Sequence, residues 1–427
     1  MAWLMKPMRG WSALQQLRTI VLFTVVVFPV AVWVAYRSHD IFTQPDANRY
    51  LAMAAGQPAM MPFASRQLGP LLVRLLSRSL HIGIAPAFEV QGALSLLFFV
   101  VATAWLLARS GAPRWTLYAV GGLMFWGLQL NALVMPDLLY AALLCGFLLL
   151  LSEGRILAAC LMMFPMTVSR ESTLLTLACF LLVGWKRLKK SEIATAVLAT
   201  GAATLLVRRM AVDALPNKEH ISPMVYLVAK MPWNFLRNVL GLGMWANVYP
   251  SCAVPKWQVQ AHLGPLHAIG FCEFFPGAIA KTFGLGMTIF GLLPVMVWMV
   301  RRQMLRTGGR EDLMLRFAIL YGVGSFLLAP TLGESFVRLF GYSWPLFLIA
   351  LPLLLGASGA NFISTWAAVA FLGLHLFLTW FLLGETPGFL FPTALVCWIV
   401  GWLLLLTTFR SKGPGSAGVV GLAGDVS

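Results

Sequence analysis

The chain has 427 residues, and 59% of them are hydrophobic without counting glycine, against about 45–50% with glycine in a typical soluble domain. Only 11% are charged. This composition excludes an ordinary soluble enzyme and predicts a helical membrane protein with many spans, because each span needs about 20 mostly apolar residues. The net charge of +16 reflects topology, since lysine and arginine collect in cytoplasmic loops. No basic stretch has the aromatic pattern of nucleic-acid binding, so we expect no nucleic-acid partner.

Apolar segments recur along the chain and predict about twelve transmembrane helices. The first is too long for the core of a signal peptide, which has about 7 to 15 residues, so we expect it to be retained. We expect one all-α, polytopic membrane domain over residues 1–409 and a disordered tail over 410–427, where glycine and serine dominate. The predicted spans are 19–36, 84–108, 115–133, 138–152, 156–168, 172–185, 193–207, 282–300, 313–330, 339–355, 362–383 and 390–409.

The distribution of basic residues predicts the orientation of these spans. With the N-terminus inside and alternating spans, the short inner connections hold many lysines and arginines, whereas the short outer hairpins hold only Arg170 and Arg338. By the positive-inside rule, both termini are then cytoplasmic. No retention or transit signal is evident, which favours a bacterial inner (plasma) membrane.

The first long outer loop covers residues 37–83 and contains two helical patterns. Residues 47–55 form a short candidate helix. Leucines then recur at helical spacing from Leu68 to Leu76, with arginines between them. This pattern predicts a helix that lies in the plane of the membrane interface.

The second long outer loop covers residues 208–281. Tryptophans and tyrosines are spread along it, which is typical of a segment that rests on the bilayer surface. It also contains Cys252 and Cys272, which can form a disulfide if this loop faces an oxidising compartment. Lys230 and Arg237 in the same loop can contact a lipid phosphate, either specifically or as nonspecific partners of anionic lipids.

Acidic residues near the membrane are candidate functional residues, because an ionisable group is expensive there. Asp46 is either the N-cap of a short helix or a base. Asp137 either caps the start of its span or takes part in substrate binding. The pair Arg170-Glu171 can simply turn a hairpin as an exposed ion pair. What favours function is that residues from distant segments are predicted at one membrane surface. They are Asp46, Arg66, Asp137, Arg170, Glu171, Glu334 and Arg338, the last two of which can alternatively form a helical ion pair.

Three short motifs are predicted to lie together at the outer face of the membrane. The first runs from Asp46 through Tyr50-Leu51 and Pro62-Phe63 to Arg66 and Pro70, the second is Asp137 and the third is Arg170-Glu171. Together with two interfacial helices in the first loop, they resemble the C-type (GT-C) membrane glycosyltransferases, over about the first 190 residues. These polytopic enzymes transfer a sugar from a polyprenyl-phosphate carrier on the outer or lumenal face.

The resemblance implies that Asp46 is the base that deprotonates the acceptor, which would be a glycan, a lipid or a protein. The chemistry agrees, because an activated sugar phosphate needs a carboxylate for the acceptor proton and cations for the departing phosphate. Arg66, Arg170 and Arg338 are the candidate cations. No acid stands next to Asp46, where the family usually has one, so the sequence does not support a bound divalent metal.

Two other functions remain open at this point. A surface-polysaccharide polymerase or ligase would use a lipid-linked oligosaccharide with the same outward arginines. A transporter of lipid-linked sugars without chemistry would usually show repeated halves and ionisable groups near the bilayer midplane, and neither pattern is evident here.

Overall fold

The computed structural model describes residues 11–38, 45–60, 63–110, 135–211, 231–246, 249–250, 254–263, 266–280, 310–332 and 336–350, with a few isolated positions besides. The predicted spans 115–133 and 362–383 and the tail 410–427 lie outside the described residues. Of the predicted spans 282–300 and 390–409, only isolated positions are described.

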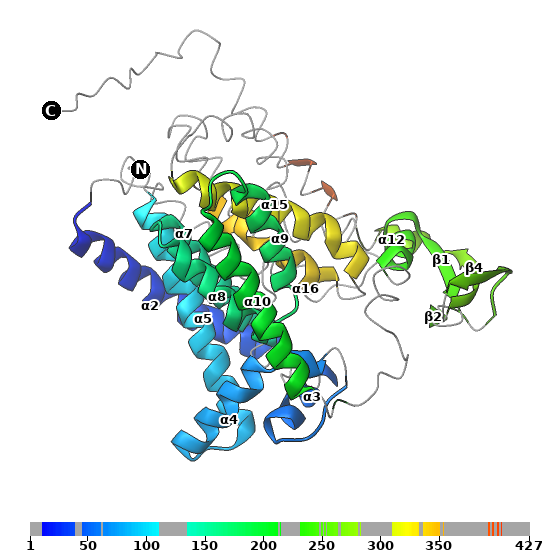
Figure 1. Ribbon diagram of the computed structural model, residues 1–427, viewed down its shortest axis with the longest axis horizontal. Helices are drawn as coiled ribbons and strands as arrows, with labels where there is room; N and C mark the ends of the chain where they lie inside the picture. Colours follow the sequence, from blue (N-terminus) through cyan, green and yellow to red (C-terminus); the bar gives the residue numbers. More distant parts are fainter. Residues whose placement is uncertain are drawn as a thin grey trace, which may run out of the picture.

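Apolar helices make up most of the described chain (Figure 1). They lie within a few residues of the predicted apolar segments and confirm the helical character of the chain. Three helical segments, Ile84–Arg109, Lys190–Met210 and Leu313–Leu332, are long and apolar enough to cross a membrane. The helices are α2 (Ala13–Ser38), α5 (Ile84–Arg109), α7 (Pro136–Ser152), α8 (Ile156–Ser169), α9 (Thr173–Gly184), α10 (Lys190–Met210) and α15 (Arg310–Leu332).

Consecutive helices α7 and α8 pack against each other through a tight turn. Gly154 has φ +72°, a left-handed conformation that glycine adopts without steric cost. The Arg155 N–H donates to the Leu150 carbonyl at 2.9 Å, which closes the end of α7. Because the chain reverses here, the start of α7 and the end of α8 lie at the same end of the bundle.

Aromatic side chains fill the core between α7, α9 and α15. Phe147 packs edge-on against Phe180, with ring centroids 5.6 Å apart, and against Phe317 at 5.1 Å. Phe99 makes a similar contact with Trp344 at 4.8 Å. These contacts join helices that are far apart in the sequence into one apolar core.

The first long loop contains the predicted helices. They are α3 (Pro45–Ala54), the 3₁₀ turn η1 (Phe63–Ser65) and α4 (Leu68–Leu80). Arg74 on α4 donates to the carbonyls of Met53 and Ala54, at 2.9 and 3.2 Å, and so satisfies the last turn of α3. Both helices lie at one end of the bundle (Figure 1).

The second long loop differs from the all-α prediction, which is wrong here. After α12 (Met231–Leu240), the strands β1 (Leu242–Ala246), β2 (Tyr249–Pro250), β3 (Trp257–Leu263) and β4 (Leu266–Phe274) form an antiparallel sheet in the order β2-β1-β4-β3. Apolar and polar residues alternate along β3, which suits a strand with two different faces. Cys252 and Cys272 form a disulfide, with Cα atoms 6.0 Å apart.

The predicted span 339–355 is also interrupted. The structure has a short helix α16 (Phe336–Gly341), then a turn, then a π-helical segment η4 (Pro345–Ala350). Pro345 has no N–H to donate to the preceding turn, which explains a break at this position. The turn places Tyr342 at the edge of the candidate site.

Candidate functional site

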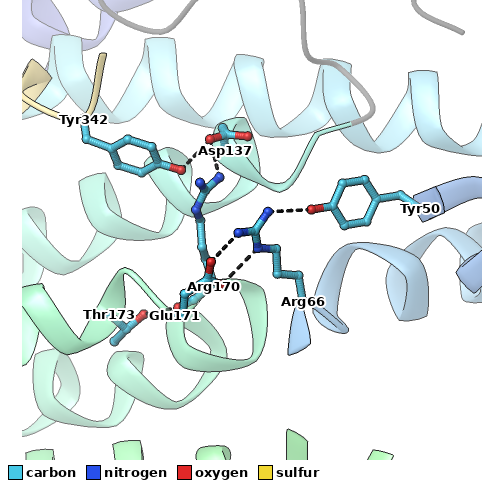
Figure 2. Close-up of polar contacts among 7 residues, drawn as sticks. All are labelled: Tyr50, Arg66, Asp137, Arg170, Glu171, Thr173 and Tyr342. Carbon is cyan, nitrogen blue, oxygen red and sulfur yellow. Dashed lines mark hydrogen bonds and ion pairs between the residues drawn. The ribbon is translucent and has the colours of Figure 1, made fainter. Parts of the chain in front are cut away.

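Charged side chains from three separate segments of the chain meet in one network (Figure 2). Arg66 comes from the segment between η1 and α4, Asp137 from the first turn of α7, and Arg170 and Glu171 from the turn between α8 and α9. These are four of the residues predicted from the sequence. The structure therefore brings together residues that are up to 105 positions apart.

Arg66 forms the first half of this network. Its Nε donates to Glu171 Oε2 at 2.9 Å, and its Nη2 donates to the other carboxylate oxygen, so the pair is bidentate. Its Nη1 donates to the Tyr50 hydroxyl on α3 at 2.8 Å. All three guanidinium nitrogens are engaged, and the side chain is only 7% exposed.

The Glu171 carboxylate is held ionised by Arg66. Desolvation alone would raise its pKa, but the charge of Arg66 and its hydrogen bonds outweigh that effect and lower the pKa to about 2. Conversely, burial would lower the pKa of Arg66, yet Glu171 and Tyr50 raise it well above its usual range. The Glu171 side chain remains 44% exposed, so the pair has one open side.

Asp137 and Arg170 form the second half and are both buried, at 6% and 5% exposure of their side chains. Arg170 donates through Nη1 to Asp137 Oδ1, and the Tyr342 hydroxyl donates to the same oxygen. The Arg170 guanidinium also lies 4.8 Å from the centre of the Tyr342 ring, a cation–π contact. The pair is thus held by residues from α7, from the end of α8 and from the turn after α16.

These contacts revise two structural interpretations. Asp137 is not an N-cap, because Met135 occupies the cap position of α7 and Asp137 lies in the first turn. Its negative charge there is favoured by the helix dipole. The pair Arg170-Glu171 is not an ion pair of neighbours on a surface, because each residue binds a partner from a different segment.

Asp46 lies on α3, one helical turn before Tyr50. It is in the first turn of the helix and 32% exposed, with Arg49 Nη1 at 3.6 Å from its Oδ1. The Arg49 guanidinium is 4.3 Å from the centre of the Phe63 ring, and Arg66 is 5.7 Å from the centre of the same ring. Asp46 is therefore connected to the network through Arg49 and Phe63.

Of the remaining predicted site residues, the structure describes the side chain of Arg237 alone. Arg237 lies on α12, beside the sheet. Lys230, Glu334 and the side chain of Arg338 lie outside the described residues, so the predicted ion pair of the last two stays a prediction.

Sequence reasoning missed Tyr50, Tyr342 and Phe63 as parts of the network. Tyr50 and Phe63 were included only as residues of a motif, because the sequence gives no sign that an apolar or aromatic residue contacts an arginine. Tyr342 is 205 positions from its partner Asp137. The one available signal was Pro345, which marks the break after the turn that carries Tyr342.

Within the described part of the chain, no group of three histidine, cysteine or acidic side chains is arranged to hold a metal ion. Comparisons with known protein families, with curated proteins and with solved structures find no match to this chain.

Proposed function

We propose that the protein is a membrane glycosyltransferase, which transfers a sugar from a polyprenyl-phosphate carrier to a glycan, lipid or protein acceptor. We place it in a bacterial plasma membrane with both termini cytoplasmic and the site outside. The observation that supports this most is the network itself: Arg66, Asp137, Arg170 and Glu171 meet at one end of an apolar bundle, next to Asp46. Charge concentrated at a membrane surface suits a substrate whose phosphate lies at headgroup level.

In this proposal Asp46 is the general base. It takes the proton of the acceptor hydroxyl while that oxygen attacks the anomeric carbon of the sugar. The bond from this carbon to the phosphate oxygen breaks, and the carrier phosphate leaves with the electron pair. A single displacement inverts the anomeric configuration. Asp46 is exposed enough to receive an acceptor, whereas Asp137 is buried.

The contacts divide the arginines by role. Arg66 and Arg170 are each paired with a carboxylate and a tyrosine, so they hold the site together and are positioning residues. Arg49 is 40% exposed and lies beside Asp46. It is the cation best placed to meet the charge that grows on the leaving phosphate.

The test compares three proteins reconstituted in membranes that supply lipid-linked sugars and acceptors. Wild type is expected to transfer labelled sugar, and Asp46→Asn is expected to lose that transfer at equal expression. The matched control is Glu273→Gln, which removes an exposed acid from the sheet and is expected to transfer normally. Equal transfer by wild type and Asp46→Asn would exclude Asp46 as the base.

The size of the transferred product separates the alternatives. A single sugar supports the proposed transferase, whereas transfer of an oligosaccharide block would identify a polymerase or ligase. Movement of the lipid-linked sugar across the bilayer without any transfer would identify a transporter and overturn the proposal.

A further inference from the structure

The sheet β1–β4 has one face composed of apolar side chains. Residues that pair directly across antiparallel strands project from the same face. Phe271 pairs with Met244 on one side and with Trp257 on the other, and Ile269 pairs with Val259. We call this side, formed by Met244, Trp257, Val259, Ile269 and Phe271, the apolar face.

A β-bulge extends the apolar face. Leu242 pairs with Phe274, so one residue of β1 lies opposite two of β4 between this pair and the pair of Met244 with Phe271. The extra residue reverses the alternation of β4. As a result Phe274 shares the side of Phe271, and the neighbouring Glu273 does not occupy it.

Several side chains of the apolar face are open to solvent. Trp257 is 59% exposed, Val259 43% and Phe274 56%. The opposite face carries Gln258, Gln260, the half-buried Trp245 and Cys272 of the disulfide. An exposed aromatic patch of this kind on one face of a small sheet indicates a surface that binds an apolar partner.

The attachment of the sheet shows where this surface lies. Two asparagines of α12 donate to carbonyls in the last turn of α15, Asn238 to Pro330 at 2.7 Å and Asn234 to Thr331 at 3.1 Å. The apolar part of α15 is long enough to cross a membrane. The module of α12 and the sheet is therefore fixed where α15 would leave the bilayer, beside the helices in Figure 1.

We infer that the apolar face lies on the lipid bilayer, with Trp257, Val259 and Phe274 at the boundary between headgroups and acyl chains. Tryptophan favours this depth because its ring is apolar and its N–H is polar. Lys256 is exposed next to Trp257 and can reach lipid phosphates from there. Phe235 and Leu240 on α12 are exposed as well. This inference does not depend on the proposed enzymatic function.

The experiment places a nitroxide label on each side of β3 in full-length protein. Val259→Cys carries it on the apolar face, and Gln258→Cys, one residue away, carries it on the opposite face. The background variant Cys397→Ser leaves Cys145, Cys160 and Cys179, which are buried, and the disulfide. The protein is reconstituted in vesicles of phosphatidylethanolamine and phosphatidylglycerol, and collisions with oxygen and with a water-soluble nickel complex are measured.

At position 259 we expect a gain in oxygen collisions and a loss of nickel collisions relative to position 258. Equal nickel collisions at both positions would overturn the inference. A strong dipolar coupling between labels at position 259 that disappears at high lipid-to-protein ratio would also overturn it, because a second copy of the chain would then cover the face. A non-reducing gel verifies that both variants keep the disulfide.

Discussion

Two ion pairs at opposite ends of α7 show how burial changes the contribution of an ion pair to stability. Asp137 pairs with Arg170 in the interior, and Glu153 pairs with Arg109, whose side chain is 51% exposed. A buried charge that loses its partner is left without water or counter-charge, whereas an exposed one is resolvated. The position of a pair therefore decides its contribution more than its geometry does.

Replacing Asp137 by Asn is expected to lower the free energy of unfolding by about 3–5 kcal/mol, because the buried Arg170 then lacks its counter-charge. Glu153→Gln is the matched control and is expected to cost about 0–1 kcal/mol. Thermal unfolding in detergent measures both. Similar losses for the two variants would contradict the assigned difference in burial.

The pair of Glu171 and Arg66 predicts a pH dependence. The pKa of Glu171 is lowered to about 2 in the folded protein from an ordinary value of 4.5. The pair therefore stabilises the fold fully above pH 4.5, and this contribution is lost as the pH falls towards 2. Glu171→Gln is expected to be less stable than wild type at pH 6 and to approach it at pH 2.5. A constant difference between the two across this range would rule out the proposed linkage.

At the scale of elements, the sequence predicted the apolar helices well and the irregular segments poorly. Helices α5, α7 and α10 lie close to the expected ranges because hydrophobicity alone defines them. The sheet was missed although β3 alternates apolar and polar residues, since aromatic rings in an outer loop suggested only surface contact. The break before Pro345 was missed because hydropathy continues across it.

For the candidate site, charge and topology predicted that Arg66 and Glu171 share a surface. Their pairing was not predicted, because it depends on packing between distant segments.

The contact between α15 and η4 depends on a glycine. A Cβ at Gly322 would overlap Leu346, including its backbone, whereas a Cβ at Gly324 on the same helix meets nothing within 4 Å. We expect Gly322→Ala to lower the unfolding temperature and to release Tyr342 from Asp137. Gly324→Ala, the control, is expected to gain up to about 1 kcal/mol from helix propensity. If Gly322→Ala were as stable as Gly324→Ala, the close approach of η4 to α15 would be incorrect.

At the scale of the whole molecule, the chain combines an apolar bundle with a small disulfide-bonded sheet module. The module is joined to α15 by the amides of Asn234 and Asn238. A disulfide persists in oxidising compartments and is rare in the cytosol. It therefore supports an outer location for the loop 208–281, on the opposite side from the predicted termini.

The disulfide makes this location testable. Cys252 and Cys272 enclose a separation of 20 residues, and the bridge is expected to stabilise the module by about 3 kcal/mol. In intact cells, a membrane-impermeant maleimide is expected to label these cysteines only after treatment with an impermeant reductant. Cys252→Ser with Cys272→Ser, the control, abolishes that labelling. Labelling of wild type without reductant would show that the bridge does not form in the cell.

The helices that carry the charged network are short. Helices α7, α8 and α9 have 17, 14 and 12 residues, which correspond to about 25, 21 and 18 Å. The hydrocarbon core of a bilayer is about 30 Å thick. The sequence predicts that these helices cross the bilayer, and neighbouring spans this short would be accommodated by local thinning of the membrane. We therefore expect the bilayer to be thinner around the network, so that the phosphate of an approaching lipid lies at the depth of the charged residues and the protein need not lift it from the membrane.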